Sequence, residues 1–420
     1  MISRRQIATL GQWLALGSLV GAIAGAASAA FLYLLDLATH TREHWRWIVF
    51  TLPVAGLVIG AIYERYGASI KGGNNLVIET VQDAKPQIPL RMAPMVLIGT
   101  VLTHLFGGSA GREGTAVQMA ASLADEVAHR IKLAPHARRQ LLAAGIAGGF
   151  GSVFGTPIAG AFFGLEVIRV GRVEYDALLP ALVASVVGDL VTRGLGIVHT
   201  AYPHVEAAAL TPSLAGRWCL FALGIALVTT AFVELLHLVK KRGEKHIPRL
   251  PIRMAVGGLV VVALWQASRT DDYLGLGVPT IVRAFTDDHL AWSAFAWKLV
   301  MTAVTVGSGF LGGEVTPLFF VGATLGNDLA RLMHLPLGLA AGIGLATVFG
   351  TAANTPIALS IMAVELLGGG VLPHVVIVAV IAYLASGHRG IYPSQKIVHG
   401  KLGEPRAEAQ SKQAADERPA

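Results

Sequence analysis

The chain alternates between long apolar runs and short polar connections. The longest apolar runs cover residues 14–37, 48–62, 141–165, 177–188, 220–239 and 371–385. A helix that crosses a bilayer needs about 20 mostly apolar residues. The runs therefore predict membrane helices, and the first two are expected over about 9–39 and 47–66 because charged residues flank them.

Other apolar runs are too short to cross a bilayer on their own. They cover residues 92–102, 318–324 and 339–348. Short apolar segments in matching halves of a chain are typical of transporters whose helices end inside the membrane. We therefore expect an all-α polytopic membrane protein that contains such helices.

Composition supports a membrane protein and argues against several other classes. Hydrophobic residues make up 54% of the chain and charged residues 14%, against about 25% charged residues in soluble domains. The net charge of +7 comes from basic residues in connections such as 130–139 and 240–245, without the interleaved aromatic residues of a nucleic-acid-binding surface. The histidines have no metal-ligand spacing and Cys219 is the single cysteine, so we expect no metal, cofactor, disulfide or nucleic-acid partner.

A glycine-rich stretch followed by an apolar run carries the candidate chemistry. Residues 107–125 read GGSAGREGTAVQMAASLAD, and Glu113 follows the first glycines. Glycines let backbone N–H groups approach a ligand closely, and the start of a helix leaves N–H groups free that attract anions. The stretch therefore predicts an anion site with an ionisable carboxylate beside it.

The stretch occurs a second time. The pattern Gly-x-Glu-x-Thr of residues 111–115 returns at 312–316, 201 positions later. In the second copy Thr316 is a good N-cap residue and Pro317 a good first helical residue, so we expect a helix that begins at Thr316. Two glycine-rich loops that each precede a helix are expected to form two walls of one site.

Other segments are repeated as well. Thr-Pro-Ile-Ala at 156–159, followed by Glu166, returns at 355–358, followed by Glu365. The near-constant offset indicates duplication of a unit of about 200 residues, although the small alphabet of membrane helices also produces chance matches. The symmetry of the two glutamates favours a structural role. We divide the chain into a basic start (1–8), a first membrane repeat (9–196), a linker (197–213), a second membrane repeat (214–395) and a polar disordered tail (396–420).

Glu113 is the first candidate for a functional residue. A carboxylate at membrane depth is costly and is therefore functional by default. A carboxylate that occupies an anion site when charged, and leaves it when protonated, couples the movement of an anion to that of a proton. The alternative is a salt bridge at the mouth of a pore, with Arg112 as the partner.

The supporting residues have both functional and structural interpretations. Glu314 either relays protons or is a structural carboxylate satisfied by backbone N–H groups. Thr115 and Thr316 either bond to the carboxylate or the ion, or cap helices. The Asn74 amide can donate to a small anion, although Asn74 and Asn75 also fit a turn and a helix start.

These motifs resemble those of the CLC anion channels and transporters. The matching residues are Gly-Arg-Glu-Gly-Thr at 111–115, Gly-Gly-Glu-Val-Thr-Pro at 312–317 and a late tyrosine, Tyr392. The resemblance implies a CLC-like inverted repeat of two helical halves, assembled as a homodimer in which each subunit has its own pore lined by helix N-termini. It also implies that the Tyr392 hydroxyl contacts the ion, whereas a lone tyrosine at this place would otherwise be expected at the membrane interface.

Departures from the ordinary chloride members point to one branch. Asn74 falls near their loop serine, Thr115 replaces their proline, Val315 replaces their phenylalanine, and Val167 lies where their antiporters often have an internal glutamate. This set resembles the fluoride-transporting branch, which implies a fluoride/proton antiporter that expels fluoride across the bacterial cytoplasmic (inner) membrane. The alternative is a chloride channel or chloride/proton exchanger of the same family.

The expected site combines both glycine-rich loops. Glu113 is expected to be the gate and the proton carrier, with Glu314 and Thr316 assisting it. Anion-binding groups are expected from Asn74, Asn75, Gly111, Thr115, Val315 and Tyr392, with Val315 contributing its backbone N–H. The expected partners are fluoride, protons, the lipid bilayer and a second copy of the chain.

A hydrolase pattern provides a competing interpretation. Residues 107–111 match Gly-x-Ser-x-Gly, in which Ser109 would be the nucleophile and His104, His237 or His374 the base. That motif needs a strand, a sharp turn and a helix, which the apolar context of this stretch does not offer. We therefore do not expect an enzyme.

Overall fold

The computed structural model describes residues 3–83, 87–206 and 208–403, and it is almost entirely helical. Its α-helices are α1 (Arg4–His44), α2 (Leu52–Tyr66), α3 (Asn74–Asp83), α4 (Met92–Leu105), α5 (Glu113–Arg130), α6 (Pro135–Phe154), α7 (Pro157–Glu166), α8 (Leu178–Gly194), α9 (Pro212–His246), α10 (Leu250–Ser268), α11 (Val278–Arg283), α12 (Ala294–Gly307), α13 (Val315–Met333), α14 (Leu337–Ala352), α15 (Pro356–Leu367) and α16 (Leu372–Ala385). Short 3₁₀ turns cover Arg46–Thr51, Ala68–Ile70, Tyr175–Ala177 and Gly369–Val371.

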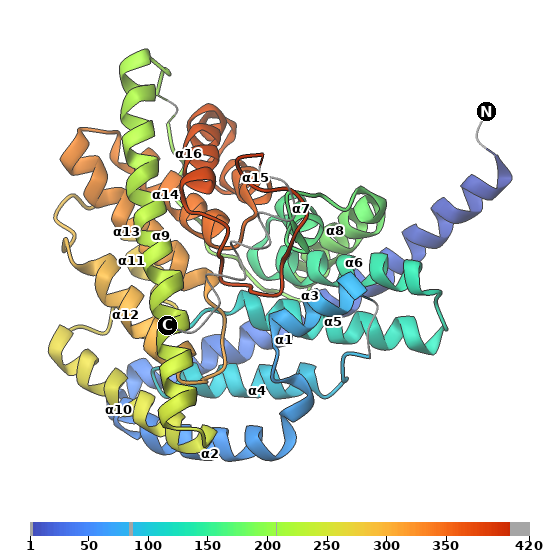
Figure 1. Ribbon diagram of the computed structural model, residues 1–420, viewed down its shortest axis with the longest axis horizontal. Coiled ribbons are helices and arrows are strands. Elements are labelled where there is room, and N and C mark those ends of the chain that lie inside the picture. Colours follow the sequence, from blue (N-terminus) through green and yellow to red (C-terminus); the bar gives the residue numbers. More distant parts are fainter. Residues whose placement is uncertain (1–2, 84–86, 207, 404–420) are drawn as a thin grey trace.

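The helices form two successive series, α1–α8 and α9–α16, with a stretch between Gly194 and Pro212 in which the described residues form no helix. In both series the fifth helix, α5 or α13, begins directly after one of the two glycine-rich loops. Matching helices of the two series meet, since α2 packs against α10 and α7 against α15. Figure 1 shows α2 and α10 together at the bottom of the view.

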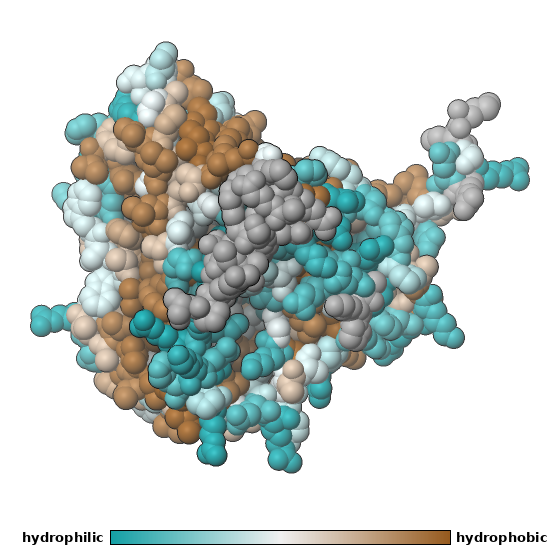
Figure 2. Space-filling view, viewed as in Figure 1, coloured by the Kyte–Doolittle hydropathy of each residue, from teal (hydrophilic) through white to brown (hydrophobic). Residues whose placement is uncertain are grey.

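Several helices are suited to a lipid environment. Five helical segments of the described chain are long and apolar enough to cross a membrane: Gln6–His44, Arg46–Tyr66, Tyr175–Gly194, Pro212–His246 and Leu250–Ser268. On α9, Leu220, Leu223 and Leu227 are exposed at spacings that place them on one face. Figure 2 shows extended hydrophobic surface on the side where α9 lies. An exposed apolar face of this kind is stable against lipid.

The apolar run 141–165 forms two helices rather than one. α6 ends at Phe154, Gly155 adopts the left-handed conformation with φ 74°, and α7 begins at Pro157. A left-handed glycine after a helix and a proline at the next helix start are the usual signals for this break. The break turns the chain inside the molecule, where Thr156 and most of the flanking residues are buried.

Glu166 and Glu365 cap each other's helices. The Glu166 carboxylate accepts hydrogen bonds from the backbone N–H groups of Ile357 and Ala358 at the start of α15, at 3.1 and 2.8 Å. The Glu365 carboxylate accepts the equivalent bonds from Ile158 and Ala159 at the start of α7, at 3.0 and 2.7 Å. The repeated Thr-Pro-Ile-Ala segments are thus helix starts whose free N–H groups are satisfied by the other repeat, in agreement with the predicted structural role.

Small residues allow the helices around the site to pack closely. A Cβ atom at Gly322 of α13 would lie only 2.1 Å from the carbonyl oxygen of Gly344 of α14. Backbone contact of this kind is common between membrane helices, because lipid provides no hydrophobic driving force between them. The close packing of α14 helps to fix the direction of α13, which carries one wall of the site.

The ends of several elements differ from the sequence-based expectation. α1 begins at Arg4, before the expected 9, because Ser3 and Gln6 form a capping box. The predicted disordered tail began at 396, whereas β2 (Lys396–Ile397) pairs in parallel with β1 (Arg169–Val170). Ile397 is buried in that contact, which explains why a polar segment is ordered there. The remainder of the predicted tail, 404–420, lies outside the described residues.

Candidate functional site

The two glycine-rich loops lie against each other. The Gly111 N–H donates to the carbonyl of Gly313 at 2.6 Å, and the Gly313 N–H donates to the carbonyl of Gly111 at 2.8 Å. This pair forms an isolated antiparallel bridge. The prediction that the loops form two walls of one site is therefore consistent with the structure. The N–H of Gly111, predicted to bind an anion, is instead used to join the loops.

Glu113 is fully buried and is held mainly by the opposite loop. Thr316 donates to its carboxylate twice, from Oγ1 to Oε1 at 2.5 Å and from the backbone N–H to Oε2 at 3.1 Å. Arg112 adds its backbone N–H at 3.1 Å to Oε2 and its Nε at 3.3 Å to Oε1. The carboxylate of α5 thus occupies the N-terminus of α13, where an anion is favoured. Both interpretations of Glu113 have support here, because the Arg112 salt bridge is present.

The second copy of the motif uses its residues differently from the first. α13 begins at Val315 with Glu314 in the N-cap position, so the prediction of Thr316 as N-cap was wrong. The hydroxyl of Thr316 is directed at Glu113 instead. One carboxylate oxygen of Glu314, Oε2, is buried and has no hydrogen-bond partner among the described residues. Glu314 is therefore not a structural carboxylate whose two oxygens are both satisfied by hydrogen bonds.

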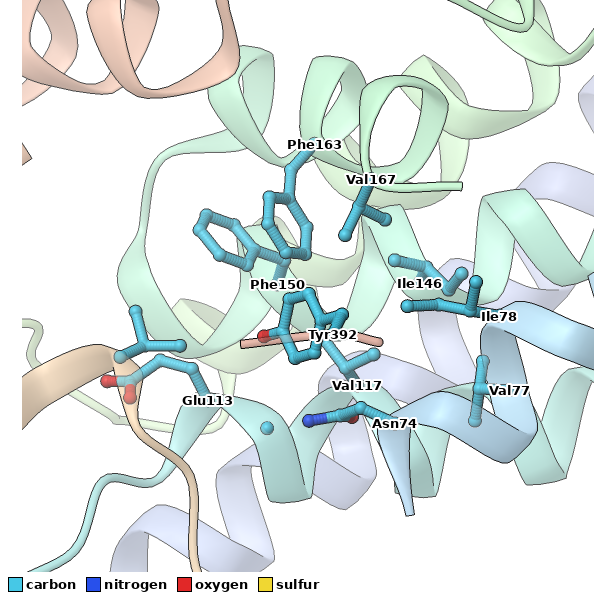
Figure 3. Close-up of a pocket in the computed structure, with 12 residues that line it drawn as sticks. Asn74, Val77, Ile78, Glu113, Val117, Ile146, Phe150, Phe163, Val167 and Tyr392 are labelled. Atoms are coloured by element: carbon cyan, nitrogen blue, oxygen red, sulfur yellow. The ribbon is translucent and has the colours of Figure 1, made fainter. Parts of the chain in front are cut away.

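A small cavity lies beside Glu113. Asn74, Val315 and Tyr392 line it together with Glu113, and Figure 3 shows Asn74, Glu113 and Tyr392 reaching it from α3, the start of α5 and the segment after α16. Its volume of about 10 Å³ is room for the centre of about one water-sized particle. As the first residue of α13, Val315 has a backbone N–H that no carbonyl of its own helix can accept.

Asn74 is in contact with the start of α5. A Cβ atom added to Gly114 would lie 2.8 Å from Nδ2 of Asn74, so a side chain at position 114 would require the amide to shift. The Asn74 Oδ1 atom is buried without a hydrogen-bond partner among the described residues. An anion accepts hydrogen bonds, so only the Nδ2 group of this amide can contact one, and Oδ1 cannot.

Two residues predicted to bind the anion form hydrogen bonds within the protein. Thr115 shares a hydrogen bond of 2.7 Å between its Oγ1 and that of Thr100 on α4. Asn75 accepts a hydrogen bond of 3.1 Å from the backbone N–H of Ser394, which ties α3 to the segment that carries Tyr392. Asn75 therefore positions that segment, and Thr115 joins α5 to α4.

Apolar side chains form the rest of the cavity wall. Phe150 and Phe163 stack on each other at a ring-centroid distance of 4.1 Å, and Val117, Ile146 and Val167 complete this side. Sequence reasoning did not select Phe150 or Phe163 for the site, because aromatic residues in apolar helices most often belong to the core. An apolar wall excludes water and lowers the local dielectric constant. Electrostatic interactions with the few polar groups of the site are therefore stronger.

Two larger cavities flank the site. The first, here called the Arg112 cavity, has a volume of about 700 Å³ and is lined by Arg112, Asp36, Arg46 and residues 196–200. The second, the Glu314 cavity, has a volume of about 470 Å³, and among the residues that line it are Asn74, Glu314, Tyr392, His237, Lys240, Lys241 and Glu244. Glu113 therefore lies between two cavities, one on the Arg112 side and one on the Glu314 side.

The hydrolase pattern does not form a nucleophile elbow. The element before 107–111 is the helix α4. Ser109 is buried, and its hydroxyl is paired with that of Thr302 at 2.9 Å. Both ring nitrogens of His104 face backbone carbonyls, those of Thr100 and Ala110. Among the described residues, no group of three or more His, Cys, Asp or Glu is arranged to hold a metal ion.

Comparison with known proteins assigns the family. A family model described as "Voltage gated chloride channel" matches residues 55–387. The chain belongs to the CLC family. A CLC protein is a channel or transporter, and the CLC fold accounts for the all-α architecture described above.

Individual CLC relatives are similar over most of their length. A chloride/fluoride channel protein of Pseudomonas syringae pv. tomato is 47% identical over 404 residues, which cover 94% of this chain and 89% of that protein. The crystal structure of a CLC-type fluoride/proton antiporter matches with a TM-score of 0.90 and 36% identity, covering 94% of this chain and all of that one. A slow cyanobacterial Cl⁻/H⁺ antiporter has a TM-score of 0.80 at 17% identity, which shows the shared fold alone.

Proposed function

We propose that this CLC protein is a membrane transporter that exports fluoride in exchange for protons. The observation that carries the proposal is the buried Glu113 carboxylate on the N-terminus of α13, held by Thr316 beside a cavity of the size of a single small ion. The similarity to a fluoride/proton antiporter and to a chloride/fluoride channel protein supports fluoride as the anion and the proton as its partner.

The site can exchange a carboxylate for a small anion. A fluoride ion must lose its hydration shell, and fixed donors must replace the water. The free N–H groups at the start of α13, the Asn74 amide and the Tyr392 hydroxyl supply these donors. When Glu113 carries a proton it no longer competes for the donors and can leave, and its departure moves the proton. Gate and proton carrier are then the same side chain.

Fluoride is favoured over chloride by particular residues. Asn74 lies at the cavity, where its Nδ2 group can donate to a small anion, and Val167 lines the wall where chloride/proton exchangers often have an internal glutamate. A chloride/proton exchanger remains the second candidate, because the Cl⁻/H⁺ antiporter of known structure has the same fold. We place the protein in the bacterial cytoplasmic membrane as a homodimer surrounded by lipid.

Anion efflux from liposomes tests the proposal. The purified chain is reconstituted, and fluoride, chloride and proton movements are recorded together with two ion-selective electrodes and a pH probe. Fluoride efflux accompanied by proton movement in the opposite direction is the expected result. Chloride efflux of equal size would overturn the choice of fluoride, and fluoride efflux without proton movement would overturn the antiporter.

A further inference from the structure

Arg112 connects the gate to the larger of the two cavities. Its Nε atom lies 3.3 Å from Oε1 of Glu113, while its side chain also lines the Arg112 cavity. The Arg112 side chain is 15% exposed and the Glu113 side chain is 0% exposed. Arg112 therefore contacts both the Arg112 cavity and the Glu113 carboxylate.

The acidic groups of this cavity already have basic partners. The ion pairs join Asp36 with His40 at 3.3 Å, Glu43 with Arg42 at 3.6 Å, Asp271 with Arg46 at 2.7 Å and Asp272 with Arg283 at 2.8 Å. Arg112 differs, because in the described part of the chain its side chain has an ion pair with Glu113 alone. The charge of Arg112 is therefore balanced by the gate itself.

The balance is lost whenever the gate is neutral or displaced. A mostly buried guanidinium without a counter-charge attracts an anion from the cavity it faces. Its Nη atoms are planar donors in addition to the charge. Resting on the proposed function, we propose that Arg112 forms an anion-loading site for fluoride, which takes up the ion at the end of the Arg112 cavity when Glu113 releases the guanidinium.

The proposal explains how arrival and gating are linked. While Glu113 is charged and bound to Arg112, the loading site is filled by the protein's own carboxylate. When Glu113 takes up a proton, the same guanidinium becomes free for fluoride, one step away from the donors of α13. Arg112 thus alternates between two anions, the gate and the cargo.

Transport kinetics test this role. Initial fluoride flux is measured in liposomes against the fluoride concentration on each side in turn, for wild type, Arg112→Gln and Arg112→Lys. We expect Arg112→Gln to raise KM for fluoride by about tenfold on one side, with a saturating rate within about threefold of wild type, because charge attraction acts on loading. Arg112→Lys keeps the charge and is expected to restore most of the affinity. Arg46→Gln, in the same cavity but paired with Asp271, is the matched control and should leave KM unchanged.

Two results would overturn the proposal. An Arg112→Gln protein with the KM of wild type and a shifted pH profile would show that Arg112 merely holds the Glu113 carboxylate. A wild-type KM that does not rise when ionic strength is increased with an inert sodium salt would also contradict charge-driven loading, and this measurement requires no variant to fold. Wild-type liposomes that carry no fluoride would instead overturn the proposed function.

Calorimetry separates loading from gating. Fluoride is titrated into the purified Glu113→Gln protein and into the Glu113→Gln/Arg112→Gln protein. Because the neutral gate leaves Arg112 without its carboxylate, we expect fluoride binding to the first protein to be about tenfold tighter than to the second. Equal affinities would overturn the loading site, even if transport by wild type is normal.

Discussion

Glu113 belongs to the first repeat by sequence but to the second repeat by its hydrogen bonds. Three of the four donors that hold it are a hydroxyl and backbone N–H groups, two of them from Thr316 of α13. The hydroxyl and the backbone N–H groups do not titrate. The strength of their hydrogen bonds to Glu113 therefore changes with the protonation of the Glu113 carboxylate alone. This arrangement suits the proposed role of Glu113 as a gate that responds to protonation.

Glu113→Gln is the first residue-scale prediction. Glutamine has nearly the shape of the neutral glutamic acid but cannot take up or release a proton. We expect fluoride-coupled proton flux to fall to the background of empty liposomes, as measured with a pH probe under a fluoride gradient. A mutant that still drives protons against that gradient would show that another group carries the proton.

Asn74→Ser is the second residue-scale prediction. Serine removes the amide from the cavity and introduces the hydroxyl that chloride members of the family have near this position. We expect the ratio of fluoride to chloride flux to decrease, by about tenfold if one hydrogen bond of about 1.4 kcal/mol is lost. Asn75→Ser is the control, because Asn75 bonds to the backbone of Ser394. Unchanged selectivity of Asn74→Ser would remove Asn74 from the mechanism.

At the scale of elements, the two repeats are joined through α7 and α15. Each helix begins at a proline and has its first free N–H groups bound by a glutamate of the other helix. α7 carries Phe163 of the cavity wall, so this joint also positions the site.

Glu365→Gln is expected to weaken the joint. Ile158 and Ala159 donate to different carboxylate oxygens, and in the amide one of these two positions becomes an NH₂ group that cannot accept from a backbone N–H. Loss of a helix cap typically reduces the free energy of unfolding by about 1 kcal/mol. Thermal unfolding in detergent should therefore occur at a lower temperature than for wild type, while Glu64→Gln at an exposed position should unfold as wild type. Equal unfolding temperatures for Glu365→Gln and wild type would contradict the capping role.

The segment after α16 is a second structural element at this scale. Its Lys401 donates to Ser386 Oγ at 3.2 Å, and its Nζ lies 4.1 Å from the centre of the Tyr383 ring. Burial lowers the pKa of Lys401 from the ordinary value of 10.5 to about 7. The docked segment therefore prefers a neutral lysine.

This lowered pKa predicts that docking depends on pH. Between about pH 7 and pH 10.5 the undocked segment binds more protons than the docked one, so docking weakens as the pH falls through this range and is constant below it. Hydrogen exchange of residues 396–403, corrected for the intrinsic pH dependence, should show more protection at about pH 9 than at about pH 7. Lys401→Met should abolish the difference. Lys396→Met, which removes the ion pair with Asp83, should retain it, and a pH dependence that survives in Lys401→Met would contradict the assignment.

At the scale of the whole molecule, one chain supplies every group of the site. Asn74, Glu113, Val315 and Tyr392 come from four distant parts of the sequence but line one cavity. If the protein is a homodimer, as we propose, each subunit is then a complete transporter.

This independence is testable in mixed dimers of wild type and Glu113→Gln, purified with two affinity tags. Native mass spectrometry should first give twice the mass of the 44.0 kDa chain. In liposomes, the mixed dimer should retain about half of the proton-coupled flux of wild type, since one of two independent subunits works. A mixed dimer without coupled flux would show that the subunits act together, and a monomer in the mass spectrum would refute the homodimer.

Much of the architecture could be predicted from the sequence. The apolar runs indicate membrane helices because a bilayer admits only segments that satisfy their own backbone hydrogen bonds. The repeated pattern at 111–115 and 312–316 indicates two related loops because Gly, Glu and Thr recur at the same spacing. Glu113 could be selected because a carboxylate among apolar membrane residues is energetically costly, which indicates a functional role.

Only the tertiary structure decided which side chains face the cavity beside Glu113. Thr115 and Thr316 occupy equivalent places in the two repeats, yet Thr115 bonds to Thr100 and Thr316 bonds to Glu113. Phe150 joins the cavity although nothing in its sequence context distinguishes it from the core. The reason is physical, since the direction of a side chain depends on how its helix is packed against partners that are far away in the sequence. A local sequence pattern determines where a helix begins, but it does not determine which residues of distant segments contact that helix start.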